Sequence, residues 1–165
     1  MLQQRYVAHT RQVLKDLMAQ AKLPPYPQLL WETVLLNQYI DLNKVHAIWC
    51  AEVPDEEIVY SGGRFKFLFN GIQGQDSIKS QGAWLAAFEY YSDAVTFAYP
   101  HRATELIRYR KFILQQFGYV DLFNHWVIIE FDQNIRTQLA SDPQLTFDDA
   151  ESFQTLFYSM LGHGT

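Results

Sequence analysis

The sequence predicts an all-α protein: a single domain of about six helices, with a helical core over about 2–161 and one small β-hairpin insertion. Three observations predict this fold. Apolar residues recur at steps of three and four in several stretches, as they do on one face of a helix. Prolines, glycines and capping residues separate these stretches. The 165 residues are 48% hydrophobic and 16% aromatic, which suits a buried core and argues against extensive disorder.

The first two helices are predicted from an amphipathic stretch and from the prolines that follow it. Apolar residues at helical spacing, with cations on the other face, indicate a helix over 2–22. Pro24 and Pro25 end it, because proline cannot continue a helix. Pro27 suits the first turn of a second helix, over 28–36.

A third helix is predicted over about 42–52. Asp41 precedes it and offers a side-chain oxygen to its first free N–H groups. Asn37 can close the helix before it. The third helix is expected to bury Val45, Ile48 and Trp49.

The pattern changes after Asp55. Residues 57–69 place two apolar stretches on either side of a Ser-Gly-Gly turn, and the second stretch has the two-residue period of a strand. A β-hairpin is predicted there. A lone hairpin is marginal in water, so its aromatic face should lie on the helices or on a strand of another protein. Residues 70–81 are polar and are expected to form a surface loop.

Three successive helices between 84 and 139 form the predicted centre of the domain. Pro100 ends the first, Gly118 can end the second, and Asp121 can cap the third. Short connections predict an αα-hairpin with the third helix packed across it. The residues expected in the core are Trp84, Phe88, Tyr91, Val95, Ala98, Leu106, Tyr109, Ile113, Phe117, Trp126, Phe131, Ile135 and Leu139.

A last helix is predicted near the C-terminus. Ser141-Asp142-Pro143 indicates a turn before it. Thr146 and Asp149 then have the spacing of a capping box. The apolar residues expected on the buried face of this helix are Phe153, Leu156, Phe157, Met160 and Leu161.

Composition limits the function classes. The chain has 13 Lys+Arg against 18 Asp+Glu, a formal charge of −5, which does not favour a nucleic-acid-binding role. The single cysteine, Cys50, excludes an internal disulfide and fits a reducing, intracellular location, cytoplasmic or nuclear. No apolar run approaches the ~20 residues that span a bilayer, so no membrane association is expected.

No cofactor or metal site is predicted. His46 and Cys50 are four residues apart, a spacing that two metal ligands can have, but no second His/Cys cluster completes a site. The glycine-containing loop at 71–77 lacks the lysine that a phosphate-binding loop has directly after its last glycine. The single helical face that carries His46 and Cys50 is therefore read as structural.

No catalytic residues are predicted either. Glu130 and Asp132 are two apart on a helix and lie on different faces, so they cannot act as paired carboxylates. Asp132 and Arg136 form an i, i+4 pair, worth about 0.2–0.5 kcal/mol on a helix surface, and a buried structural pair is an alternative. Cys50 lies within a helix, away from the N-terminal dipole that favours a thiolate.

One charged cluster stands out, in the predicted helix 101–111. Four cations lie within ten residues there: Arg102, Arg108, Arg110 and Lys111. The chain from 121 onward carries seven acids and one base. The simplest interpretation is a solvated helix face. The basic helix and the acidic C-terminal part could instead complement each other, within the domain or between copies, and phosphate binding is a third interpretation.

The spacing of aromatic and apolar residues in the central helices resembles that of a known family. W-x₃-F-x₂-Y, proline, L-x₂-Y-x₃-I and W-x₄-F-D-x₂-I-R together resemble the Gag-like protein of DIRS-like, tyrosine-recombinase retrotransposons. The upstream stretch LPPYPQLLWETVLLNQYIDLNKV is also similar to that family. Ile135 stands where the family usually has an aromatic residue. The matching positions are Trp84, Phe88, Tyr91, Pro100, Leu106, Tyr109, Ile113, Trp126, Asp132 and Arg136.

The resemblance implies a structural role, such as self-association or packaging of the element's RNA. The expected function is accordingly a non-enzymatic Gag-like assembly or protein-interaction domain, whose partner is another copy or another protein. The first alternative is a nucleic-acid-binding domain that uses the basic helix 101–111. The second is an enzyme of unrecognised type, which requires a deep pocket with titratable groups of perturbed pKa.

Overall fold

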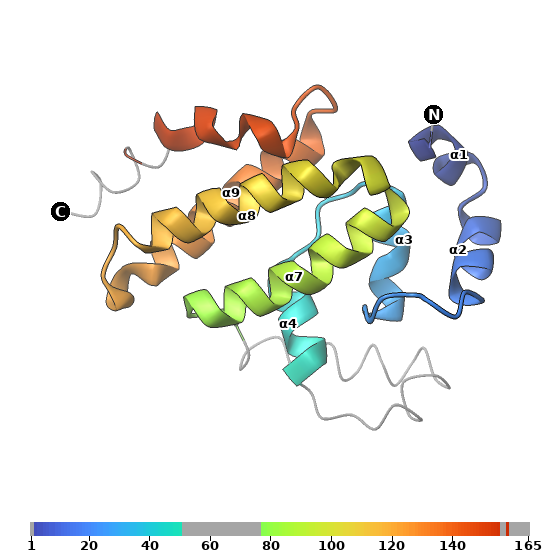
Figure 1. The fold of residues 1–165 in the computed structure, drawn as a ribbon, viewed down its shortest axis with the longest axis horizontal. Coiled ribbons are helices and arrows are strands. Elements are labelled where there is room, and N and C mark those ends of the chain that lie inside the picture. Colours follow the sequence, from blue (N-terminus) through green and yellow to red (C-terminus); the bar gives the residue numbers. More distant parts are fainter. Residues whose placement is uncertain (1, 51–76, 156–157, 159–165) are drawn as a thin grey trace.

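The computed structural model describes residues 2–50, 77–155 and 158. These residues form seven α-helices and four short 3-10 helices, and no strand occurs among them (Figure 1). The predicted all-α class is confirmed for this part of the chain. The β-hairpin predicted at 57–69 lies outside the described residues. The same is true of most of the loop predicted at 70–81, and Gln81 is already the first residue of a helix.

The three longest helices follow one another in the second half of the chain. They are α7 (Gln81–Ala98), α8 (Ala103–Phe117) and α9 (His125–Ser141). The first half holds α1 (Leu2–Ala8), α2 (Thr10–Met18), α3 (Trp31–Leu35) and α4 (Leu42–Cys50). The 3-10 helices are η1 (Gln28–Leu30), η2 (Pro100–Arg102), η3 (Leu122–Asn124) and η4 (Phe147–Phe153).

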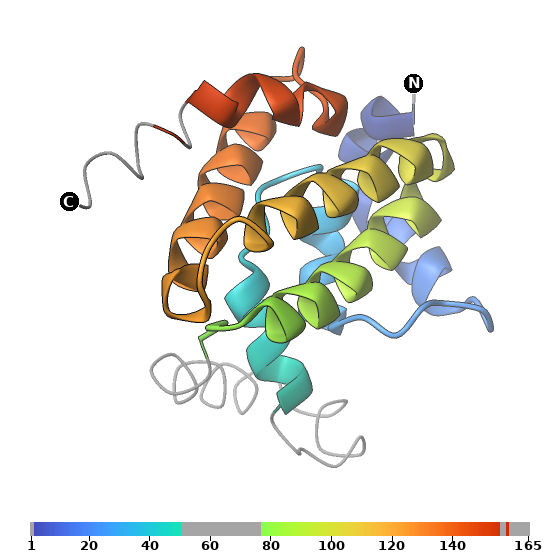
Figure 2. The same ribbon diagram turned by 60° about the vertical axis from the view of Figure 1, so that its left-hand side comes forward.

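The long helices set the architecture. α7 and α8 form the predicted hairpin around Pro100 (Figure 1), and α9 packs on α8, which it crosses at a steep angle in Figure 2. α3 and α4 pack against α7, and η4 returns over α8. The helix α9 therefore packs on one member of the hairpin, α8, and on η4. In both views α1 and α2 lie at the end of the molecule opposite to the turn between α8 and α9.

Aromatic side chains fill the centre between these helices. The indole of Trp84 stacks on Phe88 with ring centroids 4.9 Å apart, and it meets Phe117 of α8 at 5.8 Å. Phe88 in turn meets Tyr109 at 5.6 Å. Such offset and tilted pairs add to the stabilisation from burial itself. The predicted burial is confirmed for Trp84, Phe88, Tyr91, Leu106, Tyr109, Ile113, Phe131, Ile135 and Leu139.

The first predicted helix is broken at His9, which separates α1 from α2. The hydroxyl of Thr10 donates to the carbonyl of Tyr6 at 2.6 Å, a local bond that bends helices. The hydroxyl of Tyr6 donates to the carbonyl of Ala98 at 2.9 Å. The bend therefore accompanies a contact that ties α1 to the end of α7.

Two of the predicted caps are formed. The Asp41 carboxylate accepts from the N–H of Asn43 at 2.9 Å and so caps α4. After α3, Asn37 takes the left-handed conformation (φ 52°), and the N–H of Gln38 donates to the carbonyl of Thr33 at 3.0 Å. This is the hydrogen-bond pattern of a Schellman motif, so Asn37 closes the helix as predicted.

The C-terminal cap is formed in part. The N–H of Thr146 donates to the Asp149 carboxylate at 2.8 Å, which is one of the two hydrogen bonds of the predicted capping box. A 3-10 helix, η4, follows instead of regular α-helix. Most of the last predicted helix lies outside the described residues.

Three predictions about individual residues are wrong. Asp121 caps the 3-10 helix η3 only through its backbone, and α9 begins at His125. Trp126 is exposed because five residues separate it from Phe131, which places the two about 140° apart around a helix. Trp49 is also exposed, and it stacks on Tyr90 with ring centroids 4.3 Å apart.

Candidate functional site

The cations of the predicted basic helix lie at the end of η2 and on α8. Three of the four are bonded to carboxylates of the same domain. Arg102 pairs with Glu105, Arg108 with Asp148, and Arg110 with Glu89. Lys111 is exposed, and no ion pair joins it to the described residues. The structure thus divides the predicted cations between η2 and α8 and pairs most of them with carboxylates of the same domain.

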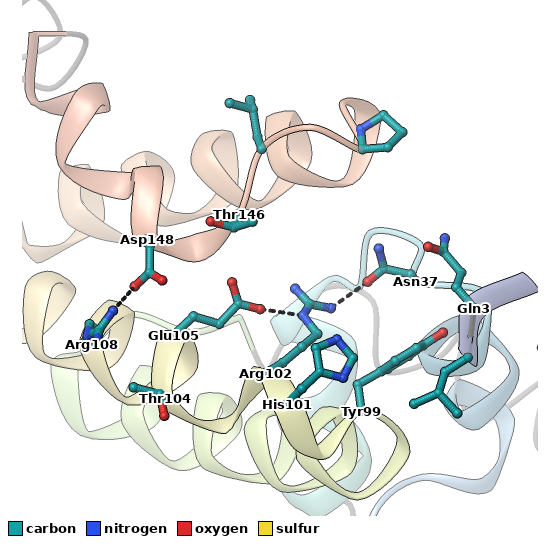
Figure 3. A pocket seen from close by; sticks show the side chains of 13 residues that line it. Gln3, Asn37, Tyr99, His101, Arg102, Thr104, Glu105, Arg108, Thr146 and Asp148 are labelled. Atoms are coloured by element: carbon teal, nitrogen blue, oxygen red, sulfur yellow. Dashed lines mark hydrogen bonds and ion pairs between the residues drawn. The ribbon is translucent and has the colours of Figure 1, made fainter.

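Arg102 holds three segments together (Figure 3). Its Nε donates to Glu105, and its Nη1 donates to the side-chain oxygen of Asn37 at 2.6 Å. The other Glu105 oxygen accepts from the backbone N–H of Phe147 at 3.1 Å, and the guanidinium lies over the Phe147 ring. The largely buried Arg102 therefore links the end of α3 and the start of η4 to α8.

The other two pairs are on the surface. Arg108 Nη1 lies 2.9 Å from Asp148 of η4, and Arg110 Nη1 lies 3.2 Å from Glu89 of α7. Exposed pairs of this kind are worth about 0–1 kcal/mol. The Arg108 pair is nevertheless one contact between the basic helix and the acidic C-terminal part within the domain.

An open cleft lies beside these residues, between α1, the start of α8 and the loop before η4 (Figure 3). Its volume is about 690 Å³, within the range of small-molecule sites. Its charged side chains, however, already bind each other. His101 and Thr104 add polar groups at its exposed rim. The cleft could hold a ligand, but no nucleophile–base pair is assembled in it.

A small chamber of about 70 Å³ adjoins the cleft and shares Arg102 and Asn37 with it. The hydroxyl of Tyr39 is buried at this place without a hydrogen-bond partner in the described part of the chain. Burial raises the pKa of Tyr91, the second tyrosine in the wall, so its hydroxyl stays protonated. A chamber of this size suits a water molecule rather than a substrate.

The pair Asp132–Arg136 is buried. It is therefore the buried structural pair that the sequence offered as an alternative to a surface pair. Arg136 Nη2 lies 2.9 Å from the Asp132 carboxylate. Arg136 also donates to the carbonyl of Ile40, and its guanidinium lies 5.4 Å from the centre of the Tyr39 ring. The hydroxyl of Tyr109 donates to the same Asp132 carboxylate at 2.6 Å. Three segments far apart in sequence therefore meet at one ion pair.

The protonation states of this network are fixed by its surroundings. Burial and the neighbouring Asp132 carboxylate raise the pKa of Tyr109 well above its usual value, so the hydroxyl remains a donor. Burial alone lowers the pKa of Arg136, but Asp132 more than offsets this and the pKa is raised overall. Tyr109, Asp132 and Arg136 are all bonded within the network. The network is therefore suited to holding helices together and not to proton transfer at neutral pH.

Sequence patterns missed the most exposed apolar group of the described residues. We call it the apolar tip: Tyr119, Leu122, Phe123 and Trp126, in and after the turn between α8 and α9. Their exposed fractions are 76%, 79%, 94% and 58%. Three aromatic side chains of this exposure, with the leucine, present on the order of 500 Å². Patches of this size on a monomer are often functional.

The local chain geometry explains this exposure. Gly118 ends α8 as predicted, with ordinary right-handed backbone angles, and a Cβ there would lie 3.3 Å from the carbonyl oxygen of Gln115. The chain then turns through η3, which points its apolar side chains outward. The sequence Tyr-Val-Asp-Leu-Phe in this short connection could have indicated the exposed apolar side chains, because connections are normally polar.

Two exposed carboxylates accompany the apolar tip. Asp121 lies within it, and Glu130 follows Trp126 by one turn on the outer face of α9. The sequence has no Lys or Arg from Phe112 to Ile135. Neither Asp121 nor Glu130 forms an ion pair with the described residues. The tip is therefore an apolar surface with an acidic border.

Comparisons with known proteins give no further guide: no family model, no curated protein and no solved structure matches the chain. Across residues 2–50, 77–155 and 158, no group of three or more His, Cys, Asp or Glu side chains is arranged to hold a metal ion. Within the same residues, every helix is too short or too polar to cross a bilayer.

Proposed function

We propose that this chain is a non-enzymatic assembly domain that associates with other copies of itself through the apolar tip. The observation that carries the proposal is the exposure of Phe123, Leu122 and Tyr119, the three most exposed large hydrophobic side chains of the described residues. Burying them against a partner removes apolar surface from water, which is the main driving force of association.

The size of the tip suits a contact between proteins. A standard interface buries about 800 Å² on each partner, with aromatic side chains near its centre. The tip supplies more than half of that area, on the order of 500 Å². Its Trp and Tyr are residue types that are enriched at interaction hot spots.

Two further observations support a structural role over catalysis or nucleic-acid binding. Three buried titratable groups, Tyr109, Asp132 and Arg136, are bonded to one another. The arginines of the basic helix are bonded to carboxylates, which leaves few cations there for phosphates. The resemblance of the central motif to Gag-like retrotransposon proteins agrees with self-association.

The test is light scattering coupled to size exclusion, over a wide range of protein concentrations. The natural chain is expected to form dimers or larger species as concentration rises. A Phe123→Ser/Trp126→Ser variant is expected to remain monomeric with an unchanged circular dichroism spectrum, because both side chains are exposed and contribute little to the core. A natural chain that stays monomeric at every concentration would refute the proposal.

A matched control is Ile107→Ser/Tyr158→Ser. Both side chains are exposed and apolar, with exposed fractions of 48% and 66%, and both lie outside the apolar tip. This variant is expected to associate like the natural chain. Equal loss of association in both variants would mean that general surface apolarity, and not the tip, drives assembly.

A further inference from the structure

A second surface at the opposite end of the molecule complements the apolar tip. α1 and α2 lie at that end in both views (Figures 1 and 2). Residues 2–22 carry four cations and one carboxylate, in a chain that has 13 Lys+Arg and 18 Asp+Glu overall. The N-terminal helices are therefore basic in a protein whose remainder is acidic.

The cations of this end differ from those of α8 in their bonding. The side chains of Arg5, Arg11, Lys15 and Lys22 are all exposed. None of them forms an ion pair with the part of the chain that the structure describes. Arg11 and Lys15 are one turn apart on α2 and share a face. Their charges are thus free to act on a partner.

Apolar surface accompanies the cations. Val7 is 57% exposed near the end of α1, two residues before the bend at His9, and Leu2 is also exposed. We call the group of Val7, Arg11 and Lys15 the basic end. It offers an apolar contact and two positive charges, whereas the tip offers an apolar contact and the two negative charges of Asp121 and Glu130.

We propose that the copies associate head to tail, with the apolar tip of one chain docked on the basic end of the next. This inference rests on the proposed self-association and names its geometry. Opposite charges then face each other across each contact, which favours encounter and fixes the register. A contact between unlike surfaces leaves one free tip and one free basic end, so association continues into rings or filaments.

Charge also argues against the alternative of a symmetric tip-to-tip dimer. A two-fold contact between tips would bring Asp121 and Glu130 of both copies together, and the sequence has no Lys or Arg between Phe112 and Ile135 to neutralise them. Like charges facing each other across an interface cost free energy. The head-to-tail contact avoids this cost and uses cations that have no partner within the described part of the domain.

A mixing experiment tests the geometry. The tip variant is Phe123→Ser/Trp126→Ser, and the basic-end variant is Arg11→Glu/Lys15→Glu. Each is expected to bind itself at least tenfold more weakly than the natural chain and to elute as a monomer. Their equimolar mixture is expected to form a 1:1 heterodimer, because one variant keeps a working basic end and the other keeps a working tip.

Charge exchange provides the second measurement. An Asp121→Lys/Glu130→Lys variant is expected to bind the basic-end variant and to have lost binding to itself, since both of its docking surfaces are then positive. Lys111→Glu is the control, because it reverses an exposed cation outside both surfaces, and it is expected to leave association unchanged. Arg11→Gln/Lys15→Gln serves in the mixing experiment if the charge-reversed chain does not fold.

The outcomes separate this inference from the proposed function. A basic-end variant that associates as strongly as the natural chain, with no heterodimer in the mixture, would overturn head-to-tail docking and leave association through the tip standing. A natural chain that never associates would overturn both. Heterodimers in the mixture and rescue by charge exchange would establish the head-to-tail contact.

Discussion

Two neighbouring parts of α9 depart in opposite ways from the usual distribution of apolar and charged side chains. Near the start of the helix, the aromatic side chain of Trp126 lies in water. Further along, the charged side chains of Asp132 and Arg136 lie in the core, with exposed fractions of 1% and 5%. Apolar residues usually lie inside and charges outside, so each part departs from the rule in its own direction.

The difference helps to distinguish residues that stabilise the fold from residues that contact a partner. The buried charges are satisfied by one another, by Tyr109 and by the carbonyl of Ile40, so their departure from the rule is resolved within the chain. The exposed Trp126 has no such resolution in the described residues. A departure resolved internally indicates stability, and one left unresolved indicates a partner.

The largest expected effect comes from breaking the buried pair. Arg136→Met should lower the free energy of unfolding by about 3–5 kcal/mol, because it leaves the Asp132 carboxylate buried without a counter-charge. Urea denaturation followed by circular dichroism measures this loss. The double variant Asp132→Leu/Arg136→Met should cost less than Arg136→Met alone, since it removes both charges. A loss below about 1 kcal/mol in the single variant would contradict the role given to the pair.

A smaller effect is expected from Tyr109→Phe. This change removes the hydroxyl that donates to Asp132 and keeps the buried ring. Hydrogen bonds to charged groups contribute about 1.5–3 kcal/mol, so the free energy of unfolding should fall by that amount. The matched control is Tyr119→Phe, whose hydroxyl belongs to the exposed tip and whose removal should leave stability unchanged. Equal effects in both variants would count against the network.

The smallest effect on stability is expected at Trp126. Trp126→Ser should change the free energy of unfolding by no more than about 0.5 kcal/mol, as surface substitutions do. The same chemical change at the buried Trp84 should destabilise the protein by about 3–5 kcal/mol. Thermal unfolding of the two variants provides the comparison. A large loss at Trp126 would mean that this tryptophan belongs to the core of the folded monomer.

The helical class and several helix ends could be predicted from local chemistry. Asp41, Asn37 and Pro100 act on backbone groups within a few residues of themselves, so their effects can be predicted from sequence alone. The 3,4 spacing of Trp84, Phe88 and Tyr91 was equally informative, because one face of α7 meets α8 along much of its length.

The contacts of the candidate site were harder to predict from the sequence, for physical reasons. Asn37, which accepts a hydrogen bond from Arg102, and Asp148, which pairs with Arg108, are far from these arginines in the sequence, and no local rule predicts such contacts. Trp126 was assigned to the core by its residue type, although its spacing from Phe131 contradicts this. An exposed aromatic residue at a contact with another molecule looks like a core residue in the sequence.

The long sequence separation of these contacts has a consequence for the order of folding. Tyr6 bonds to Ala98, Tyr99 to Leu35, and Arg136 to Ile40, so several bonds of the first helices are made to the second half of the chain. Closing such long loops is slow compared with pairing adjacent helices. During synthesis the residues of α1 to α4 are made before those of α7 and α9. Trp31 and its neighbours are therefore exposed to solvent until the later helices pack on them. If copies associate through the apolar tip as proposed, this delay is the interval in which premature association is most damaging.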